Sequence, residues 1–210
     1  MIKVLVADDH AVVRHGLRQI LADTDDIVVG GEAGTAEDAL RLLKEQRFSV
    51  VILDINIRGS NGLELLAEMR KERPEVRALV LTVYSEDQYA VRAIRGGAHG
   101  FLTKESAPER LVEAVRKIAA GGRYVSAEVA ERLASFIADD EKRSPHERLS
   151  NREFEILKML AAGRSVTQIA QDLTLSAKTV STHRTRILGK MQLKSNAELA
   201  SYALRNGLLE

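Results

Sequence analysis

The chain has 210 residues, which fits two domains of ordinary size, and its 45% hydrophobic and 29% charged content is typical of globular proteins rather than disordered or fibrous ones. The absence of cysteine excludes disulfides, thiolate metal sites and cysteine nucleophiles. The net charge of +1 is unevenly distributed: residues 1–122 hold 17 Lys/Arg against 19 Asp/Glu, whereas residues 149–210 hold 9 against 5. The C-terminal part is therefore the one suited to a polyanion.

Residues 1–122 alternate short β-branched runs with helical patterns, which indicates a parallel sheet covered by helices. Strands are predicted at Ile2–Ala7, Ile27–Ala33, Val50–Leu53, Ala78–Thr82 and Gly100–Leu102, and helices near 11–22, 36–46, 62–72, 87–95 and 108–120. The run Val50–Leu53 is continuously apolar, as expected when helices cover both faces of the sheet. The predicted fold class here is α/β, a five-stranded, doubly wound parallel sheet of the flavodoxin-like type.

Residues 123–148 are predicted to be a linker with a short helix. Gly121 and Gly122 end the last helix of the first part, a helical pattern covers residues 127–138, and a charged stretch with one proline follows at 139–147. Residues 149–210 carry no strand pattern. Their caps predict a small all-α domain of four helices, with capping boxes at Ser150/Glu153 and Ser195/Glu198 and N-caps at Ser165 and Ser176.

Polar residues follow the strands of the first part at their carboxyl ends, where ligands of such sheets gather. Asp8 and Asp9 follow the first strand, Asp54 the third, Thr82 ends the fourth and Lys104 follows the fifth. Three converging carboxylates would repel one another, so a hard divalent cation is expected between them, with magnesium as the expected ion. One carboxylate can then attack phosphorus while the ion and the lysine neutralise the phosphoryl oxygens.

Four segments carry a family resemblance: Val-Ala-Asp8-Asp9-His, Val-Val-Ile-Leu-Asp54-Ile-Asn, Val-Leu-Thr82-Val-Tyr and Gly100-Phe101-Leu-Thr-Lys104. Over residues 1–122 the chain resembles the receiver domains of two-component response regulators. The resemblance implies these roles: Asp54 as phosphoacceptor; Asp8, Asp9, Asp54 and the backbone carbonyl of Asn56 as metal ligands; Thr82 and Lys104 as partners of the phosphoryl group; Phe101 as the aromatic switch. In many relatives this aromatic is tyrosine and proline follows the lysine, so Phe101 and Glu105 depart from the pattern.

Residues 162–180 read as a helix, a short turn and a second capped helix, which is the pattern of a helix-turn-helix. Together with Leu149-Ser-Asn-Arg-Glu-Phe-Glu-Ile-Leu, this region resembles the LuxR-type domain of NarL/FixJ-class regulators. On a helical wheel Val180, Ile187 and Met191 face the core, with His183 on their border. The opposite side is predicted to enter the major groove, with Ser181, Thr182 and Thr185 at base edges and Lys178, Arg186, Lys190 and Lys194 mainly at phosphates.

The two resemblances imply a DNA-binding transcription regulator rather than an enzyme. A partner sensor histidine kinase is expected to phosphorylate Asp54, and the protein is then expected to bind promoter DNA as a homodimer, through domain release, dimerisation or both. No apolar run approaches the roughly 20 residues of a membrane span, and the N-terminal run is soon broken by Asp8 and Asp9. We therefore expect no signal peptide, no membrane partner and a cytoplasmic protein.

Three alternatives remain open at this point. A phosphatase of the haloacid dehalogenase class also uses an aspartyl nucleophile with magnesium, but that nucleophile ends the first strand. A flavodoxin-like cofactor binder would need a phosphate loop after the first strand, where Asp8 and Asp9 would repel phosphate. The third is a nucleic-acid-binding regulator that is never phosphorylated, against which only the acidic pocket argues.

Overall fold

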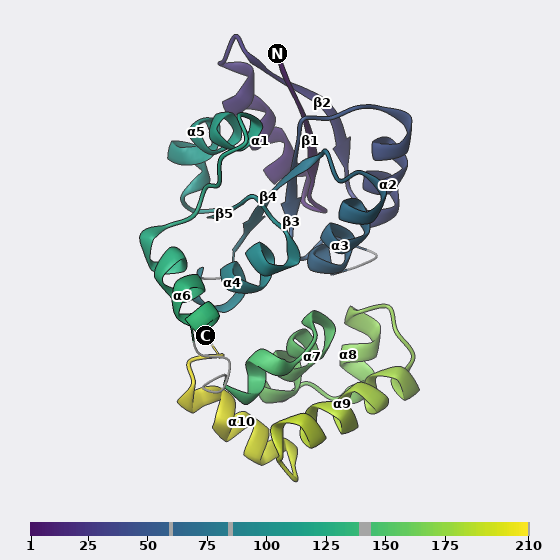
Figure 1. Ribbon diagram of the computed structural model, residues 1–210. Helices are drawn as coiled ribbons and strands as arrows, with labels where there is room; N and C mark the ends of the chain where they lie inside the picture. The colour runs from purple at the N-terminus through teal and green to yellow at the C-terminus, as the bar shows by residue number, and fades with distance from the viewer. Residues whose placement is uncertain (59–60, 84–85, 139–143, 210) are drawn as a thin grey trace. The chain divides into compact units, whose positions relative to one another are not determined.

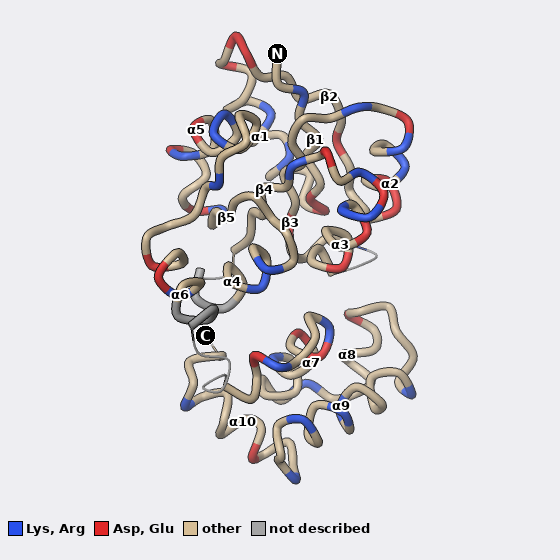
Figure 2. The backbone as a smooth tube through the Cα atoms, in the orientation of Figure 1, with Lys and Arg blue, Asp and Glu red and all other residues tan. Residues whose placement is uncertain are grey.

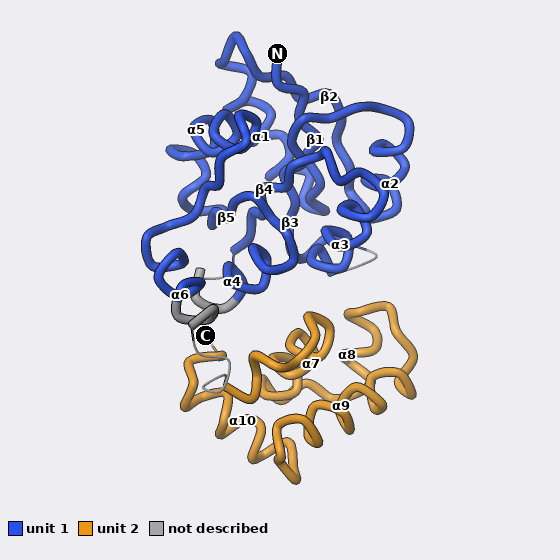
Figure 3. Tube along the Cα trace, in the orientation of Figure 1, with its two compact units in different colours: residues 1–135 blue, residues 136–210 orange. Residues whose placement is uncertain are grey.

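The protein is described by a computed structural model that covers residues 1–58, 61–83, 86–138 and 144–209. It divides into two compact units, residues 1–135 and residues 136–210 (Figure 3). We call them the N-terminal and the C-terminal unit. Among the described residues, every helix is too short or too polar to cross a membrane.

The N-terminal unit is built on a five-stranded parallel sheet in the order β2-β1-β3-β4-β5 (Figure 1). The strands are β1 (Ile2–Ala7), β2 (Ile27–Ala33), β3 (Val50–Asp54), β4 (Arg77–Thr82) and β5 (Gly100–Thr103). The helices are α1 (Ala11–Ala22), α2 (Ala36–Glu45), α3 (Gly62–Glu72), α4 (Glu86–Gly96) and α5 (Ala107–Ala119). Helices α1 and α5 pack together on one face, and α2, α3 and α4 cover the other. The predicted doubly wound α/β fold is confirmed.

Burial on both faces explains why the central strands are uninterrupted apolar runs. All five residues of β3 are buried, and Val4, Val6, Ile52 and Leu81 belong to one core cluster with α1 and α5. The strand ends differ from the prediction by single residues. Strand β3 includes Asp54, because this residue still pairs with Leu81 of β4. A polar residue can thus complete a buried strand where the sheet meets its ligand-binding edge.

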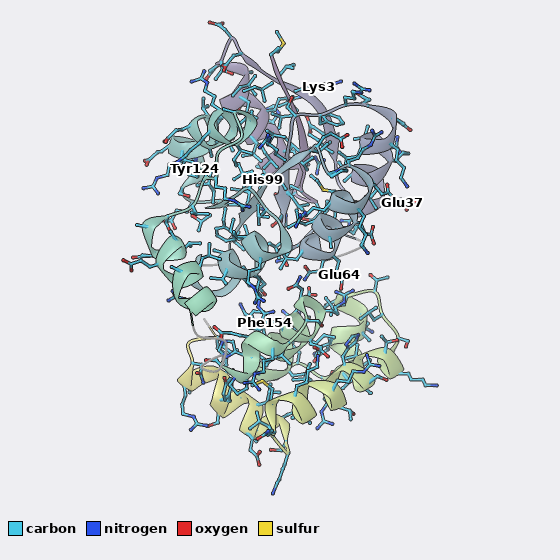
Figure 4. The ribbon with its side chains drawn as sticks, in the orientation of Figure 1. Lys3, Glu37, Glu64, His99, Tyr124 and Phe154 are labelled. Carbon is cyan, nitrogen blue, oxygen red and sulfur yellow. The ribbon has the colours of Figure 1, made fainter. Side chains whose placement is uncertain are left out.

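The segment after α5 closes the edge of the sheet. Gly121 ends α5 in the left-handed conformation, with φ +100°, as its position predicted. Three residues later, the Tyr124 carbonyl accepts a hydrogen bond from the Phe101 N–H at 2.9 Å, and the Tyr124 N–H donates to the His99 carbonyl at 2.9 Å. Figure 4 labels His99 and Tyr124. The first residues of the predicted linker therefore bind the free edge of β5, for which the sequence carried no signal. The predicted helix at 127–138 is confirmed as α6 (Ala127–Ala138).

After the end of α6, the described residues of the C-terminal unit form a short 3-10 helix, η2 (Pro145–Arg148), and four α-helices. These are α7 (Asn151–Ala161), α8 (Val166–Asp172), α9 (Ala177–Met191) and α10 (Asn196–Arg205). They pack around buried side chains that include Phe154 (Figure 4), Ile169, Val180 and Leu199. The predicted small all-α domain with four helices is confirmed. Residues 139–143 of the predicted linker lie outside the described residues.

Three of the four predicted helix caps formed as expected, and one formed in part. Ser150, Ser165 and Ser176 each accept a hydrogen bond from the third backbone N–H of their helix. Ser195 also accepts from the Glu198 N–H. The predicted capping box there was wrong, because the Glu198 carboxylate accepts from the Lys194 N–H at 2.8 Å instead of from Ser195. Glu198 thus reaches one residue further back than a capping box requires.

Candidate functional site

The polar residues at the carboxyl edge of the sheet converge as the strand order requires. Asp54 and Asp8 end or follow neighbouring strands, and both are almost fully buried, with 3% and 2% of their surface exposed. Lys104 reaches both from beyond β5: its Nζ is 2.8 Å from Asp54 Oδ2 and 2.6 Å from Asp8 Oδ2. Parallel strands bring Lys104 next to Asp54, although the two residues are 50 positions apart in the sequence.

Asp54 and Lys104 each affect the pKa of the other. Burial raises the pKa of Asp54 above its ordinary value, and the nearby charge of Asp8 acts in the same direction, whereas Lys104 opposes both. Burial would lower the pKa of Lys104, but its hydrogen bonds to Asp54 and Asp8 raise it. Lys104 is therefore held as a cation between two carboxylates. A further cation in the site would favour the charged form of Asp54.

Asp8 Oδ1 and Asp9 Oδ1 lie near the imidazole of His10, which was not among the predicted site residues. Potential metal-ligand atoms of Asp8, Asp9, His10 and Asp54 all lie within 4.8 Å of one another. His10 Nδ1 is 2.7 Å from Asp9 Oδ1 and 3.3 Å from Asp8 Oδ1. Arg14, one turn further along α1, donates to the Asp8 backbone carbonyl at 2.7 Å. Neither residue was predictable from strand ends, because His10 lies at the N-cap of α1 and Arg14 lies within that helix.

Thr82 and Phe101 are both buried, on β4 and β5. Thr82 is fully buried at the end of β4, and its backbone carbonyl accepts from the Lys104 N–H at 2.7 Å. Phe101 is 1% exposed, so its ring packs inside the unit. Asn56 is exposed, and a hydrogen bond from its backbone lowers the pKa of Asp54. Thr82 and Lys104 thus lie with Asp54 at the carboxyl edge of the sheet, whereas Phe101 is the second residue of β5 and pairs with Val80 of β4.

Gly62 begins α3 directly beside the backbone of Asp54 and Ile55. Its N–H donates to the Ile55 carbonyl at 2.7 Å. A Cβ at this position would lie 2.2 Å from the Asp54 backbone oxygen and 2.8 Å from Ile55 Cα. Only glycine allows so close an approach of α3 to the backbone of Asp54.

A second candidate surface is formed by α9 of the C-terminal unit and by Lys194, which follows it. The seven residues predicted to contact DNA are all exposed: Lys178, Ser181, Thr182, Thr185, Arg186, Lys190 and Lys194. Val180, Ile187 and Met191 are buried on the opposite face, which confirms the predicted orientation of the helix. Figure 2 shows several Lys and Arg residues along α9. An exposed, basic and hydroxyl-rich helix face of this kind suits the major groove.

Two features of α9 were not visible in the sequence. The Thr182 and Thr185 hydroxyls donate to the backbone carbonyls of Lys178 and Ser181, at 3.0 and 3.1 Å. Their oxygens can still accept hydrogen bonds from a ligand. Lys190 Nζ lies 2.6 Å from Oε2 of the buried Glu153 on α7. Lys190 thus has a partner within the domain besides any phosphate it contacts.

Fold, acidic cluster and basic helix together define the class of protein. Residues 4–116 match the response regulator receiver domain family, and residues 147–203 match the LuxR family of bacterial regulatory proteins. The chain therefore belongs to the response regulators that join a receiver domain to a LuxR-type DNA-binding domain. This combination identifies a regulator of transcription.

Individual relatives span the whole chain. Response regulator GacA of Pseudomonas aeruginosa is 39% identical over 100% of this chain and 99% of its own length. Response regulator UvrY of Escherichia coli K12 is 37% identical over 99% of this chain and 96% of its own. RcsB from Salmonella enterica serovar Typhimurium, in a structure bound to promoter rprA with the phosphomimetic BeF₃⁻, is 25% identical with a TM-score of 0.67, and the match covers 96% of this chain and 97% of that one.

Proposed function

We propose that this response regulator is switched by transfer of a phosphoryl group to Asp54 from a partner sensor histidine kinase in the cytoplasm. The observation that carries the proposal is the burial of Asp54 at the end of β3, with the Lys104 ammonium 2.8 Å from its carboxylate. We assign residues 1–122 to the receiver domain, 123–148 to a linker and 149–210 to the DNA-binding domain.

The chemistry follows from the groups around Asp54. One Asp54 carboxylate oxygen bonds to phosphorus as the phosphorus–nitrogen bond of the kinase phosphohistidine breaks, and the histidine leaves. Lys104 neutralises phosphoryl oxygens from its place between Asp54 and Asp8. The Thr82 hydroxyl then turns toward the new group, and Phe101 repacks in response.

We propose that Asp8, Asp9, Asp54 and the backbone carbonyl of Asn56 hold Mg²⁺. Oxygen donors are the ligands this ion prefers, and the carboxylate atoms lie close enough to share one ion. The ion would neutralise charge on the transferred phosphoryl group. Calorimetry of the Asp9→Asn variant tests the assignment: magnesium affinity should fall, and an unchanged affinity would place the ion elsewhere.

We propose that α9 binds promoter DNA, and that the phosphorylated protein acts as a homodimer on two half-sites. The exposed hydroxyls of Ser181, Thr182 and Thr185 would contact base edges. Lys178, Arg186, Lys190 and Lys194 would contact mainly phosphates. Support comes from the exposure of all seven side chains and from RcsB, whose structure contains promoter DNA and a phosphoryl mimic.

Intact-mass measurement after incubation with acetyl phosphate tests the acceptor. The wild-type chain should gain one phosphoryl group only when magnesium is present, and Asp54→Ala should gain none. A gain that persists in Asp54→Ala would overturn the assignment. No gain at all in the wild type would favour a regulator that works without phosphorylation.

A further inference from the structure

His10 occupies the N-cap position of α1 without acting as a cap. Its side chain makes no capping hydrogen bond, and the residues that commonly cap helices are Ser, Thr, Asp and Asn. The His10 backbone N–H instead donates to Asp8 Oδ1 at 2.8 Å. The ring lies on the same side, with Nδ1 2.7 Å from Asp9 Oδ1 and 3.3 Å from Asp8 Oδ1. Capping therefore does not explain the orientation of this imidazole.

His10 Nδ1 lies close enough to both carboxylate oxygens to share an ion with them, at 2.7 Å from Asp9 Oδ1 and 3.3 Å from Asp8 Oδ1. Asp54 also offers a ligand atom within 4.8 Å of those of Asp8, Asp9 and His10. Lys104 pairs with Asp8 Oδ2 and Asp54 Oδ2 rather than with these oxygens. Asp8 Oδ1 and Asp9 Oδ1 thus face the imidazole.

A nitrogen ligand changes which ions a site prefers. Carboxylate and carbonyl oxygens suit Mg²⁺, whereas imidazole binds first-row transition ions more strongly, in an order that rises from Mn²⁺ through Co²⁺ to Ni²⁺. Building on the metal site proposed above, we propose that His10 Nδ1 is an additional ligand of that site. It raises the affinity for a first-row transition cation such as Co²⁺ relative to Mg²⁺.

Calorimetric titration of the full chain with Mg²⁺ and, separately, with Co²⁺ tests the role of His10. His10→Phe keeps a planar ring but removes the nitrogen. It should lower the Co²⁺ affinity at least about tenfold, since even loss of an outer-shell partner commonly changes metal affinity by about 10–100-fold. The Mg²⁺ affinity should stay within about twofold, because that ion favours oxygen ligands. Co²⁺ should also shift the NMR signals of the His10 ring strongly in the wild type.

His15→Phe is the matched control, because His15 lies exposed on the same helix and its Nδ1 contacts Arg18 at 2.8 Å. It should leave both affinities unchanged. Equal loss of both affinities in His10→Phe, a rise of both, or no change would overturn the role of His10. If the wild type binds neither ion, or Asp9→Asn binds both as well as the wild type, the metal site itself is refuted. Should His10→Phe fail to fold by circular dichroism, His10→Asn replaces it, because asparagine suits an N-cap.

Discussion

At the scale of single residues, Gly62 is a highly restrictive position, because a Cβ there would overlap the backbone of the proposed acceptor. We expect Gly62→Ala to lower the free energy of unfolding by about 2–3 kcal/mol, since the new Cβ forces backbone apart rather than a flexible side chain. Urea denaturation measures this loss. The rate of Asp54 phosphorylation should fall as well, because the displaced backbone includes Asp54 at the end of β3.

Gly16 provides the matched control for that substitution. It lies within α1, and a Cβ built on it meets nothing within 4 Å. Gly16→Ala should therefore raise the free energy of unfolding by about 0.5–1 kcal/mol, through higher helix propensity. If both variants changed stability equally, close packing at Gly62 would not be the cause.

The acidic residues of the site could be placed from sequence, whereas the groups around them could not. Asp8, Asp54 and Lys104 were predictable because strand ends of a parallel sheet share one edge, and the structure brings them together. His10 contacts the carboxylate of the residue before it, and Arg14 reaches back to the Asp8 backbone carbonyl. Such contacts depend on side-chain direction, which periodicity does not encode.

At the scale of elements, α9 and the residues that follow it should make two kinds of DNA contact, one to phosphates and one to base edges. Lys194→Ala should weaken binding to every sequence and reduce the salt slope of binding by roughly one unit, if the lysine contacts a phosphate. Thr182→Ala should leave the slope almost unchanged and relax the preference at one or two base pairs by about 1–3 kcal/mol. Titration of a selected and a scrambled DNA over several salt concentrations measures both effects. The opposite assignment of effects would mean that the helix is rotated in the groove.

The contact between α7 and α9 should make stability depend on pH. Burial would raise the pKa of Glu153, but its partners Lys190 and Ser150 lower it below the ordinary value of 4.5. A carboxyl with a lowered folded pKa contributes stability that is fully present above the unfolded pKa and is lost as pH falls through the folded pKa.

We therefore expect Glu153→Gln to lower the free energy of unfolding by about 1–2 kcal/mol near neutral pH. The difference from the wild type should shrink as pH falls through the lowered pKa of Glu153. Urea denaturation at neutral and acidic pH measures the change. Lys190→Met should remove most of the difference, and an effect of Glu153→Gln that is independent of both pH and Lys190 would refute the ion-pair explanation.

The presence of α9 and the face that it buries were predictable from sequence, because apolar residues at helical spacing must face a core. Val180, Ile187 and Met191 are buried as the wheel required. The Lys190 partner was not predictable, since Glu153 lies 37 residues away in the sequence. The predicted capping box at Ser195 was wrong because the Glu198 carboxylate can reach two neighbouring backbone N–H groups, and it accepts a hydrogen bond from that of Lys194.

At the scale of the whole molecule, the two-part organisation was visible in the change from alternating strands and helices to helices alone. The structure of the boundary region after α5 was not visible in the sequence, because Tyr124 pairs with a strand more than twenty residues before it. That pairing joins the backbone of Phe101, the proposed switch residue, to the first residues after α5. A backbone shift at Phe101 would therefore also displace Tyr124, where the chain leaves the receiver domain.

The same pairing protects the sheet from other chains. An unpaired strand edge presents N–H and C=O groups that can add a strand from a second molecule, which leads to aggregation. Tyr124 occupies those groups at Phe101 and His99. A receiver cut after Gly122 should therefore aggregate faster than one cut after Ser126, as measured by light scattering, although both keep α5 complete. Equal aggregation rates would mean that the edge of β5 needs no such cover.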